Sequence, residues 1–259
     1  KKATYASISE ELDEIIENKI DDIIEKKITL VKKEESVEIL DDKPLLNDKP
    51  FDYENNFFLS CDSARMAKNI AQYILFEKTM GIAGDIVECG VFKGASLARL
   101  AMYRKILKLD DKGLVGFDTF GLFPETRYEK DKKKRKEFIL EAGSQSISED
   151  QMLEVLMQKK CDKNISLIKG DITETVPEFV NKNPNMKISI LNLDVDIYEP
   201  TVTILEHLYP LISPGGILVL DDYNTFHGET NAVNEYFKGK NIVINKPIFD
   251  LTPYFIVKL

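Results

Sequence analysis

Four aspartates lie directly after two apolar runs in the C-terminal half of the chain. Asp194 and Asp196 follow the run 188–193, and Asp221 and Asp222 follow the run 216–220. We expect both runs to be strands of an open α/β sheet, in which ligands bind at the carboxyl ends of the strands. If the strands are neighbours, the carboxylates converge, and they repel one another unless a cation lies among them. Oxygen ligands favour Mg2+, Mn2+ or Ca2+, so the sequence predicts a site for a hard divalent cation.

Two alternatives remain for these acids. Acidic residues in exposed loops are common without any metal. The spacing of Asp194 and Asp196 also fits the D-x-D pair with which glycosyltransferases hold a metal and the diphosphate of a nucleotide-sugar.

A glycine turn near the middle of the chain is a second candidate site. Glu88 is followed by Gly90 and Gly94, where a predicted strand gives way to a helix. Glycine lets the backbone approach a ligand closely, and a helix N-terminus offers free N–H groups to a carboxylate. The spacing is not the G-x-G-x-x-G of dinucleotide sites, and Glu88 would repel a pyrophosphate. The acid suits a positively charged ligand, such as the amino group of a methionine moiety; a turn without a ligand is the alternative.

Two more acids end predicted strands. Asp118 ends the segment 113–118, where an acid of a nucleotide-binding sheet accepts hydrogen bonds from ribose hydroxyls. On its own, Asp118 could equally be a turn or helix-cap residue. Asp171 follows the third predicted strand and either contacts an adenine amino group or caps the helix that begins near Thr173.

The two histidines and a basic segment are weaker signals. His207 falls inside a predicted helix, which favours a structural role. His227 lies just past Asp221 and Asp222, where it could bind or deprotonate an acceptor. The basic segment Lys130–Lys136 either attracts a phosphate-bearing acceptor or is a solvated loop, and we favour the loop.

Alternating strands and helices must position these residues. Strands are predicted at Asp85–Cys89, Gly113–Phe117, Ile165–Lys169, Ile188–Leu193 and Gly216–Leu220, and helices at 63–80, 95–107, 148–159, 173–182 and 200–212. Continuous apolar strands alternating with helices predict a doubly wound parallel sheet. Two antiparallel strands at Ile242–Phe249 and Tyr254–Lys258 would make it a seven-stranded, mostly parallel α/β sheet.

The first 60 residues differ from the rest. Apolar residues recur at helical spacing from Ile8 to Ile24, and Ser7 with Glu10 has the spacing of a capping box. We expect a helical extension to about residue 34 and then a polar connector with Pro44 and Pro50. The prediction is therefore a helical arm and connector over 1–60 and a catalytic domain over 61–259. The arm either joins a homo-oligomer, covers the site as a lid, or packs as a plain helix.

Composition excludes several classes of protein. The 259 residues carry a net charge of -9, which argues against nucleic-acid binding. No apolar run approaches the length of a membrane span, and no secretory signal opens the chain. Three scattered cysteines imply no disulfide framework. We expect a cytoplasmic enzyme that acts on a small molecule.

Four segments together resemble the macrocin O-methyltransferase (TylF/MycF) family. They are Gly84–Ser96, Gly116–Pro124, Asp194–Thr201 and Gly215–Tyr223, and the resemblance covers about residues 60–259. It implies the Rossmann-like methyltransferase fold and transfer of a methyl group from S-adenosylmethionine (SAM), with Mg2+, to a sugar hydroxyl of a natural product. The basic stretch Tyr128–Lys136 and the helix of residues 8–34 depart from the family pattern, which leaves the acceptor open.

The resemblance also implies a place for each candidate residue. The methionine part of SAM would lie against Glu88, Gly90, Gly94 and Ser96, the ribose against Asp118 and Thr119, and the adenine against Asp171. The metal ligands would be Asp194, Asp221 and Asp222, and the general base would be Asp194 or Asp196.

Overall fold

The computed structural model describes residues 49–246, 248–250 and 252–259. The predicted helix of residues 8–34, its capping box and its proposed role in a homo-oligomer lie outside these residues. The larger of two compact units, Leu45–Arg135 with Ser144–Leu259, contains the sheet and every candidate site residue. Lys136–Gly143 belong to the other unit.

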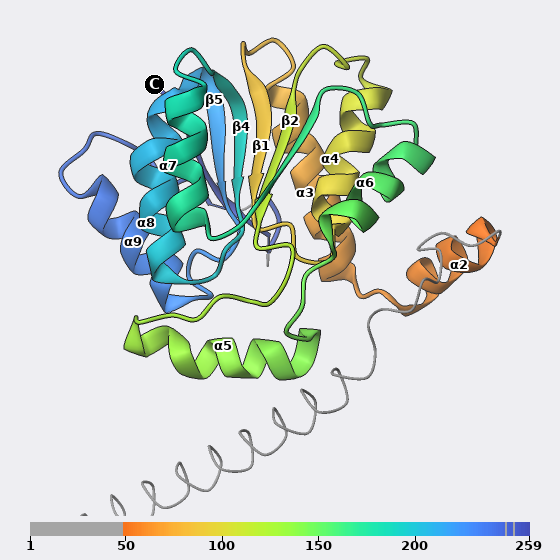
Figure 1. Cartoon of the computed structure of the whole chain (residues 1–259), viewed down its shortest axis with the longest axis horizontal. Coiled ribbons are helices and arrows are strands. Elements are labelled where there is room, and N and C mark those ends of the chain that lie inside the picture. The colour runs from red at the N-terminus through yellow and green to blue at the C-terminus, as the bar shows by residue number, and fades with distance from the viewer. Residues whose placement is uncertain (1–48, 247, 251) are drawn as a thin grey trace, which may run out of the picture. The chain divides into compact units, whose positions relative to one another are not determined.

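A mostly parallel sheet forms the centre of the larger unit (Figure 1). Its strands are β1 (Asp85–Cys89), β2 (Leu114–Asp118), β3 (Ile165–Lys169), β4 (Ile188–Leu193), β5 (Ile212–Leu220) and β6 (Tyr254–Val257). Over the described residues the sheet has six strands in the order β3-β2-β1-β4-β5-β6. The first five are parallel, and β6 pairs antiparallel with β5.

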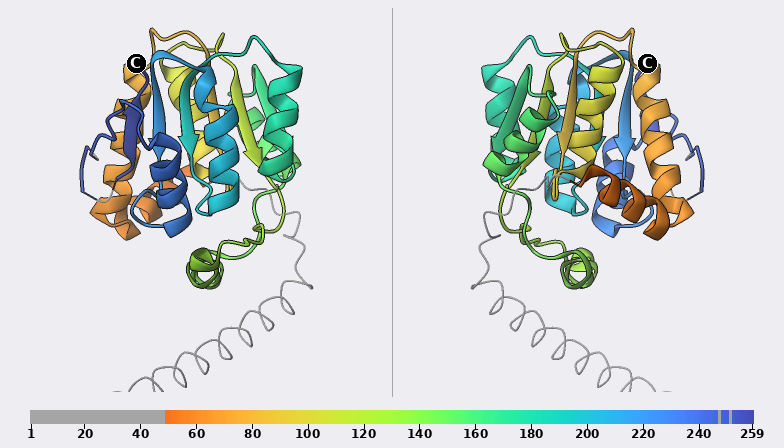
Figure 2. Two further views of the ribbon diagram at one scale, coloured as in Figure 1. Left: turned by 90° about the vertical axis from the view of Figure 1, so that its left-hand side faces the viewer. Right: turned by 90° about the vertical axis from the view of Figure 1, so that its right-hand side faces the viewer.

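Helices cover both faces of the sheet, as the two side views of Figure 2 show. The helices among the described residues are α2 (Pro50–Ser60), α3 (Ser63–Lys78), α4 (Ala95–Ile106), α5 (Glu129–Ala142), α6 (Glu149–Gln158), α7 (Ile172–Lys182), α8 (Tyr198–His207) and α9 (His227–Phe237), with a short 3-10 helix at Tyr209–Leu211. Apolar residues of α7, α8 and α9 pack with one face of the sheet, and those of α3, α4 and α6 pack with the other. The predicted doubly wound fold is therefore confirmed.

Strand β1 shows how the sequence builds both layers. Ile86 packs with the α3/α4/α6 layer and its neighbour Val87 with the α7/α8/α9 layer, because successive strand side chains point to opposite faces. All six residues of β4 are buried for the same reason. A strand covered on both faces is mostly apolar, with Ser189 and Asn192 as the polar exceptions in β4, so these runs could be recognised as strands.

The predicted seventh strand is wrong. Among the described residues of the segment 242–249, there is no strand. A single isolated bridge joins Asn245 to Phe255 of β6. Asn245 Nδ2 also donates to the Phe255 carbonyl oxygen at 3.2 Å. The apolar alternation of this segment is genuine, but a single bridge satisfies too few backbone groups to extend the sheet.

Three helices were not predicted. The expected connector contains α2, which Pro50 opens at a position where proline needs no N–H partner. The basic segment expected to be a solvated loop is part of α5. Helix α9 follows the second acidic pair. Of these, α5 and α9 supply acids to the site described next.

Candidate active site

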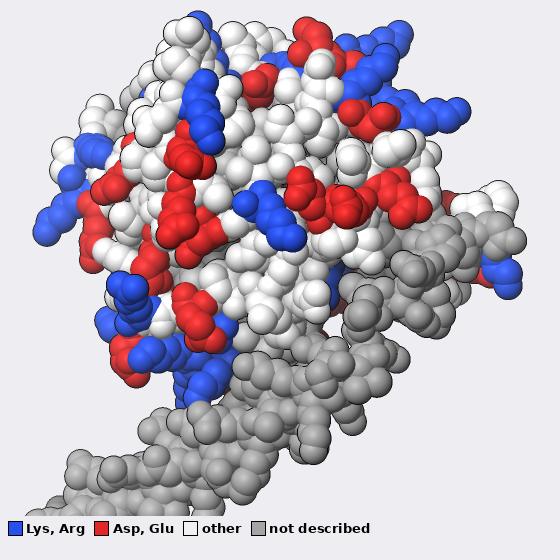
Figure 3. Space-filling view, in the orientation of Figure 1, with Lys and Arg blue, Asp and Glu red and all other residues white. Residues whose placement is uncertain are grey.

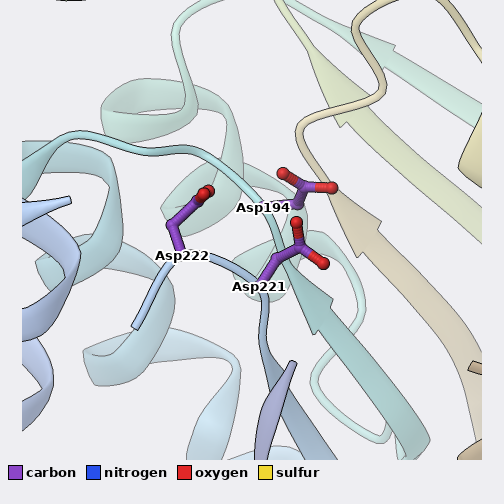
Figure 4. Close-up of side chains that lie close together, drawn as sticks. All are labelled: Asp194, Asp221 and Asp222. Carbon is purple, nitrogen blue, oxygen red and sulfur yellow. The ribbon is translucent and has the colours of Figure 1, made fainter. Parts of the chain in front are cut away.

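The predicted acidic cluster forms at the ends of β4 and β5. Leu193 pairs with Leu220 in the parallel register, so Asp194 and Asp221 leave neighbouring strands at the same level. One carboxylate oxygen from each of Asp194, Asp221 and Asp222 lies within 4.8 Å of the others. Figure 4 shows Asp194 and Asp221 turned toward each other, with Asp222 beside them. Two pairs of acids 25 or more residues apart in sequence thus share one site.

Burial makes this cluster electrostatically costly. It raises the pKa of Asp194, and the negative charge of Asp221 raises it further. Burial followed by the charge of Asp196 raises the pKa of Asp222 in the same way. Within the described part of the chain, the buried Oδ2 atom of Asp222 has no hydrogen-bond partner. An unpartnered, buried carboxylate oxygen among other carboxylates fits a hard cation.

Two further buried acids stand behind the cluster. Asp196 has a left-handed backbone with φ of 63°, and burial followed by the charge of Asp194 raises its pKa to about 8. Glu229, at the start of α9, is fully buried, and its Oε1 accepts a hydrogen bond from the Asp222 backbone N–H at 3.2 Å. Burial and then Asp222 raise the pKa of Glu229. Glu229 was missed because α9 was not predicted; the sequence offers no other signal for it.

Helix α3 brings one cation to the acids. Lys68 Nζ lies 2.6 Å from Asp221 Oδ2. Burial by itself would lower the pKa of Lys68, but the charges of Asp221 and Asp194 outweigh it and raise the pKa above its usual value. Lys68 lies 126 residues before Asp194 in the chain, and no motif in the sequence marks it.

The glycine turn lies directly beside the acids. Gly90 has φ of 92°, and a Cβ there would collide with the backbone carbonyl of Asp194. The ends of β1 and β4 can therefore meet only because residue 90 lacks a side chain. Gly94, with φ of 83°, occupies the N-cap position of α4. Both predicted glycine positions are thus required by the geometry of the turn.

Glu88 is fully buried within this turn. Its Oε1 accepts a hydrogen bond from Asn192 Nδ2 at 2.9 Å, whereas Oε2 has no partner among the residues described. Burial raises the pKa of Glu88 to about 7. Nearby, the Ser96 hydroxyl accepts a hydrogen bond from Gln72 Nε2 of α3 at 2.7 Å. An acid with one free oxygen next to a helix N-terminus can take an ammonium group, and the N–H groups of α4 can take a carboxylate.

The sequence model of the macrocin O-methyltransferase (TylF) family matches residues 54–255. The chain belongs to this family. Mycinamicin III 3''-O-methyltransferase from Micromonospora griseorubida is 26% identical over 161 residues, which are 60% of this chain and 61% of that protein. Demethyldecarbamoylnovobiocin O-methyltransferase from Streptomyces niveus is 27% identical over 177 residues, 65% of this chain and 64% of that protein. The matches span less than two thirds of either curated relative.

The fold of this macrocin O-methyltransferase family member is shared with a solved structure. The calicheamicin methyltransferase CalS11 superposes with a TM-score of 0.66 at 22% sequence identity, covering 92% of this chain and 91% of that chain. The Rossmann-like methyltransferase fold is thereby confirmed. The family match gives no support to the glycosyltransferase alternative. Among the described residues, no helix is long and apolar enough to cross a membrane.

In this family member Asp118 binds its own backbone. Oδ2 accepts hydrogen bonds from the N–H groups of Val91 and Phe92, at 2.8 and 2.9 Å, and Oδ1 accepts one from Phe120 at 2.7 Å. The Thr119 hydroxyl also donates to Oδ1, at 3.2 Å. The turn role left open for Asp118 is therefore present, and its contact with a ribose stays a prediction.

Asp171 has the alternative role that the sequence offered. It is the N-cap of α7, and its Oδ1 accepts hydrogen bonds from the Thr173 N–H at 2.8 Å and the Thr173 hydroxyl at 2.7 Å. The exposed carboxylate retains a second oxygen, so a contact with adenine is compatible with capping and stays a prediction.

Helix α5 is anchored close to His227. Asp131 is fully buried and accepts hydrogen bonds from the Gly228 N–H at 2.7 Å and the Tyr198 N–H at 3.0 Å. One carboxylate thus caps the N-termini of both α8 and α9, the helices that follow the acidic loops. His227 itself is exposed at the first position of α9. Asp131 was missed because it lies within a segment whose other charges suggested only a loop.

The basic residues of α5 are partly neutralised. Lys132 forms an ion pair with Glu129 at 2.6 Å, and Arg135 donates to the Pro124 carbonyl oxygen at 2.7 Å and to Glu125 at 3.0 Å. Figure 3 shows basic and acidic side chains interspersed on this face. A phosphate-bearing acceptor at this segment stays a prediction.

Proposed function

We propose that this protein is a metal-dependent O-methyltransferase that moves a methyl group from SAM to a hydroxyl of a sugar or glycosylated natural product. The observation that carries the proposal is the position of the glycine turn directly against the acidic cluster. Gly90 contacts the backbone of Asp194, so a donor bound at the turn and an acceptor bound at the acids would lie side by side. Transfer of a methyl group needs such proximity between donor and acceptor.

SAM fits the turn in charge and in shape. The free oxygen of buried Glu88 suits the amino group of the methionine moiety, and the N-terminus of α4 with Ser96 suits its carboxylate. Asp118 and Thr119 are proposed to contact the ribose, and Asp171 the adenine. The curated relatives are both named as O-methyltransferases, which supports a methyl donor at this place.

Asp194, Asp221 and Asp222 are proposed to hold Mg2+. Their oxygens lie within 4.8 Å of one another, and the buried Oδ2 of Asp222 has no donor among the described residues. A divalent cation there would lower the pKa of a sugar hydroxyl and hold it toward the methyl group. The aspartates would fix where the acceptor oxygen lies.

The proton of the acceptor is proposed to pass to Asp194 or Asp196, with His227 as a third candidate. Burial and neighbouring carboxylates raise the pKa of Asp194, and they raise the pKa of Asp196 to about 8, so the metal-free cluster binds protons more readily than exposed aspartates do. Added positive charge would favour the ionised form and make these carboxylates competent as bases. His227 is exposed beside the site, where it would meet an acceptor that reaches past the acids.

The names of the relatives support the proposed acceptor class. The mycinamicin and demethyldecarbamoylnovobiocin enzymes are named for natural-product substrates. A small-molecule hydroxyl acceptor, first of all a sugar, is therefore the class to screen.

Calorimetric titration with SAM and with S-adenosylhomocysteine, each with and without MgCl2, tests the proposal. We expect both ligands to bind, and we expect methyl transfer to a panel of sugars, nucleotide-sugars and glycosylated natural products to require the metal. Absence of binding by either ligand would overturn the methyltransferase proposal. Full turnover after exhaustive chelation would overturn the metal part alone.

A further inference from the structure

One face of α3 contacts both halves of the site. Lys68 and Gln72 are four residues apart, so they lie on the same side of the helix. Lys68 bonds Asp221 in the acidic cluster, and Gln72 bonds Ser96 at the start of α4. Gln72 also accepts a hydrogen bond from Arg99 Nε at 2.9 Å, which fixes the helix face in place. Helix α3 thus holds the ammonium of Lys68 against the acids.

The ammonium partly neutralises a strongly acidic, poorly solvated site. The Asp221 side chain is only 8% exposed, and Lys68 also interacts electrostatically with Asp194 and Asp222. These are the same three acids whose oxygens form the candidate metal site. Two cations so close together repel each other strongly where water does not screen them. A divalent ion and the ammonium therefore oppose each other at this cluster.

We propose that Lys68 is an internal counter-cation that holds Asp221 in the metal-free protein and that the divalent metal displaces. The inference rests on the proposed metal site and adds to it a residue that sets metal affinity. Lys68 keeps the acids together when no metal is bound and weakens metal binding because its own ion pair must first be broken. Metal binding then exchanges the Lys68 ammonium for the divalent ion. The exchange takes place beside α3, whose Gln72 forms the hydrogen bond with Ser96.

Titration of the whole protein with MgCl2, followed by calorimetry, tests the exchange. Lys68→Met should bind Mg2+ at least about tenfold more tightly than the unaltered protein, because the competing charge is gone. Lys68→Arg keeps the charge and should stay within about threefold of the unaltered protein. Lys78→Met is the matched control, since it removes the same charge from the exposed end of the same helix. Its Mg2+ affinity should not change.

Unchanged or weaker Mg2+ binding by Lys68→Met, with binding intact in the unaltered protein, would overturn the counter-cation and leave the proposed function standing. No Mg2+ binding by any variant, with SAM binding retained, would overturn the metal site and the inference together.

A second measurement uses the unaltered protein and so does not depend on how a variant folds. Brief acetylation with acetic anhydride, read by mass spectrometry, should label Lys68 faster after MgCl2 is added, while Lys78 is unaffected. Equal labelling of Lys68 with and without MgCl2 would show that the ammonium stays on Asp221 and would overturn the exchange.

Discussion

Asp118 at the end of β2 and the acids at the ends of β4 and β5 are held in opposite ways. Asp118 is surrounded by donors from its own chain, and three backbone N–H groups point at its two oxygens. At the ends of β4 and β5, Asp194 and Asp222 are buried against other carboxylates, and Oδ2 of Asp222 finds no donor among the described residues. Asp118 stabilises the turn that it belongs to, whereas Asp194 and Asp222 are electrostatically unfavourable in the metal-free protein.

This difference separates an acid that stabilises the fold of the site from acids that are available to a ligand. An acid satisfied by backbone donors contributes to folding whether or not a ligand is present. A cluster of unsatisfied acids gains its stability only when protons or a cation arrive. The comparison therefore predicts that ligands will change the β4–β5 acids far more than Asp118 and its turn.

The largest effect is expected from Asp221→Asn combined with Asp222→Asn. Two neutral amides cannot hold a hard cation, so metal-dependent turnover should fall by about a thousandfold or more. SAM binding should survive, because the glycine turn is untouched. Steady-state kinetics and SAM calorimetry on the same sample measure both. Asp110→Asn, in the loop before β2 and so at the opposite end of the strands from the cluster, serves as the control and should keep full activity. A double variant that turns over normally would show that the acids are not the reaction site.

The next effect is a pH dependence of stability confined to the metal-free protein. The pKa of Asp196 is raised to about 8 and that of Glu88 to about 7, both by burial. Because these folded values exceed the unfolded ones, the stabilisation is complete below about pH 4 and is lost as the pH rises through 7 to 8. The Tm without metal should fall across this range, and MgCl2 should restore much of it at pH 8. Asp196→Asn should flatten the profile; a Tm that rises from pH 5 to pH 8 without metal would contradict the buried, protonated acids.

A smaller effect is expected from Asp118→Ala. Removing the acceptor of three backbone N–H groups should lower the free energy of unfolding by about 3 kcal/mol, because two of those hydrogen bonds are buried. Affinity for SAM should fall as the turn loosens. Urea denaturation with and without SAM separates the two. If the free energy of unfolding were unchanged while SAM affinity fell, Asp118 would act on the ribose alone. The stabilising role inferred from its backbone hydrogen bonds would then be wrong.

The smallest effect is expected from Asp171→Ala. Loss of the N-cap of α7 should cost about 1 kcal/mol of stability, which chemical denaturation can measure. Asp171→Ser retains a capping oxygen and should recover most of that loss. A fall in SAM affinity common to both variants would support the adenine contact, whereas unchanged affinity in both would leave capping as the role of Asp171.

Much of this protein follows from local pattern. The strands β1, β3 and β4 have the bounds that their sequences predict, because short runs rich in isoleucine, valine and leucine between turn residues are typical of strands. Gly90 and Gly94 were recognisable since positive φ strongly favours glycine. Asp194, Asp221 and Asp222 were placed together in advance because the carboxyl ends of parallel neighbours lie at one edge.

Only the tertiary structure decided which charges face one another. Lys68 and Glu229 join the cluster from α3 and α9, and neither has a sequence pattern that differs from an ordinary helical residue. Asp131 caps two helices at once because packing brings Tyr198 and Gly228 to it. Local periodicity predicts which face of a helix is buried, but long-range packing determines which residues that face contacts. The sequence alone therefore predicted the doubly wound fold and the candidate metal ligands, and the structure added Lys68 beside them.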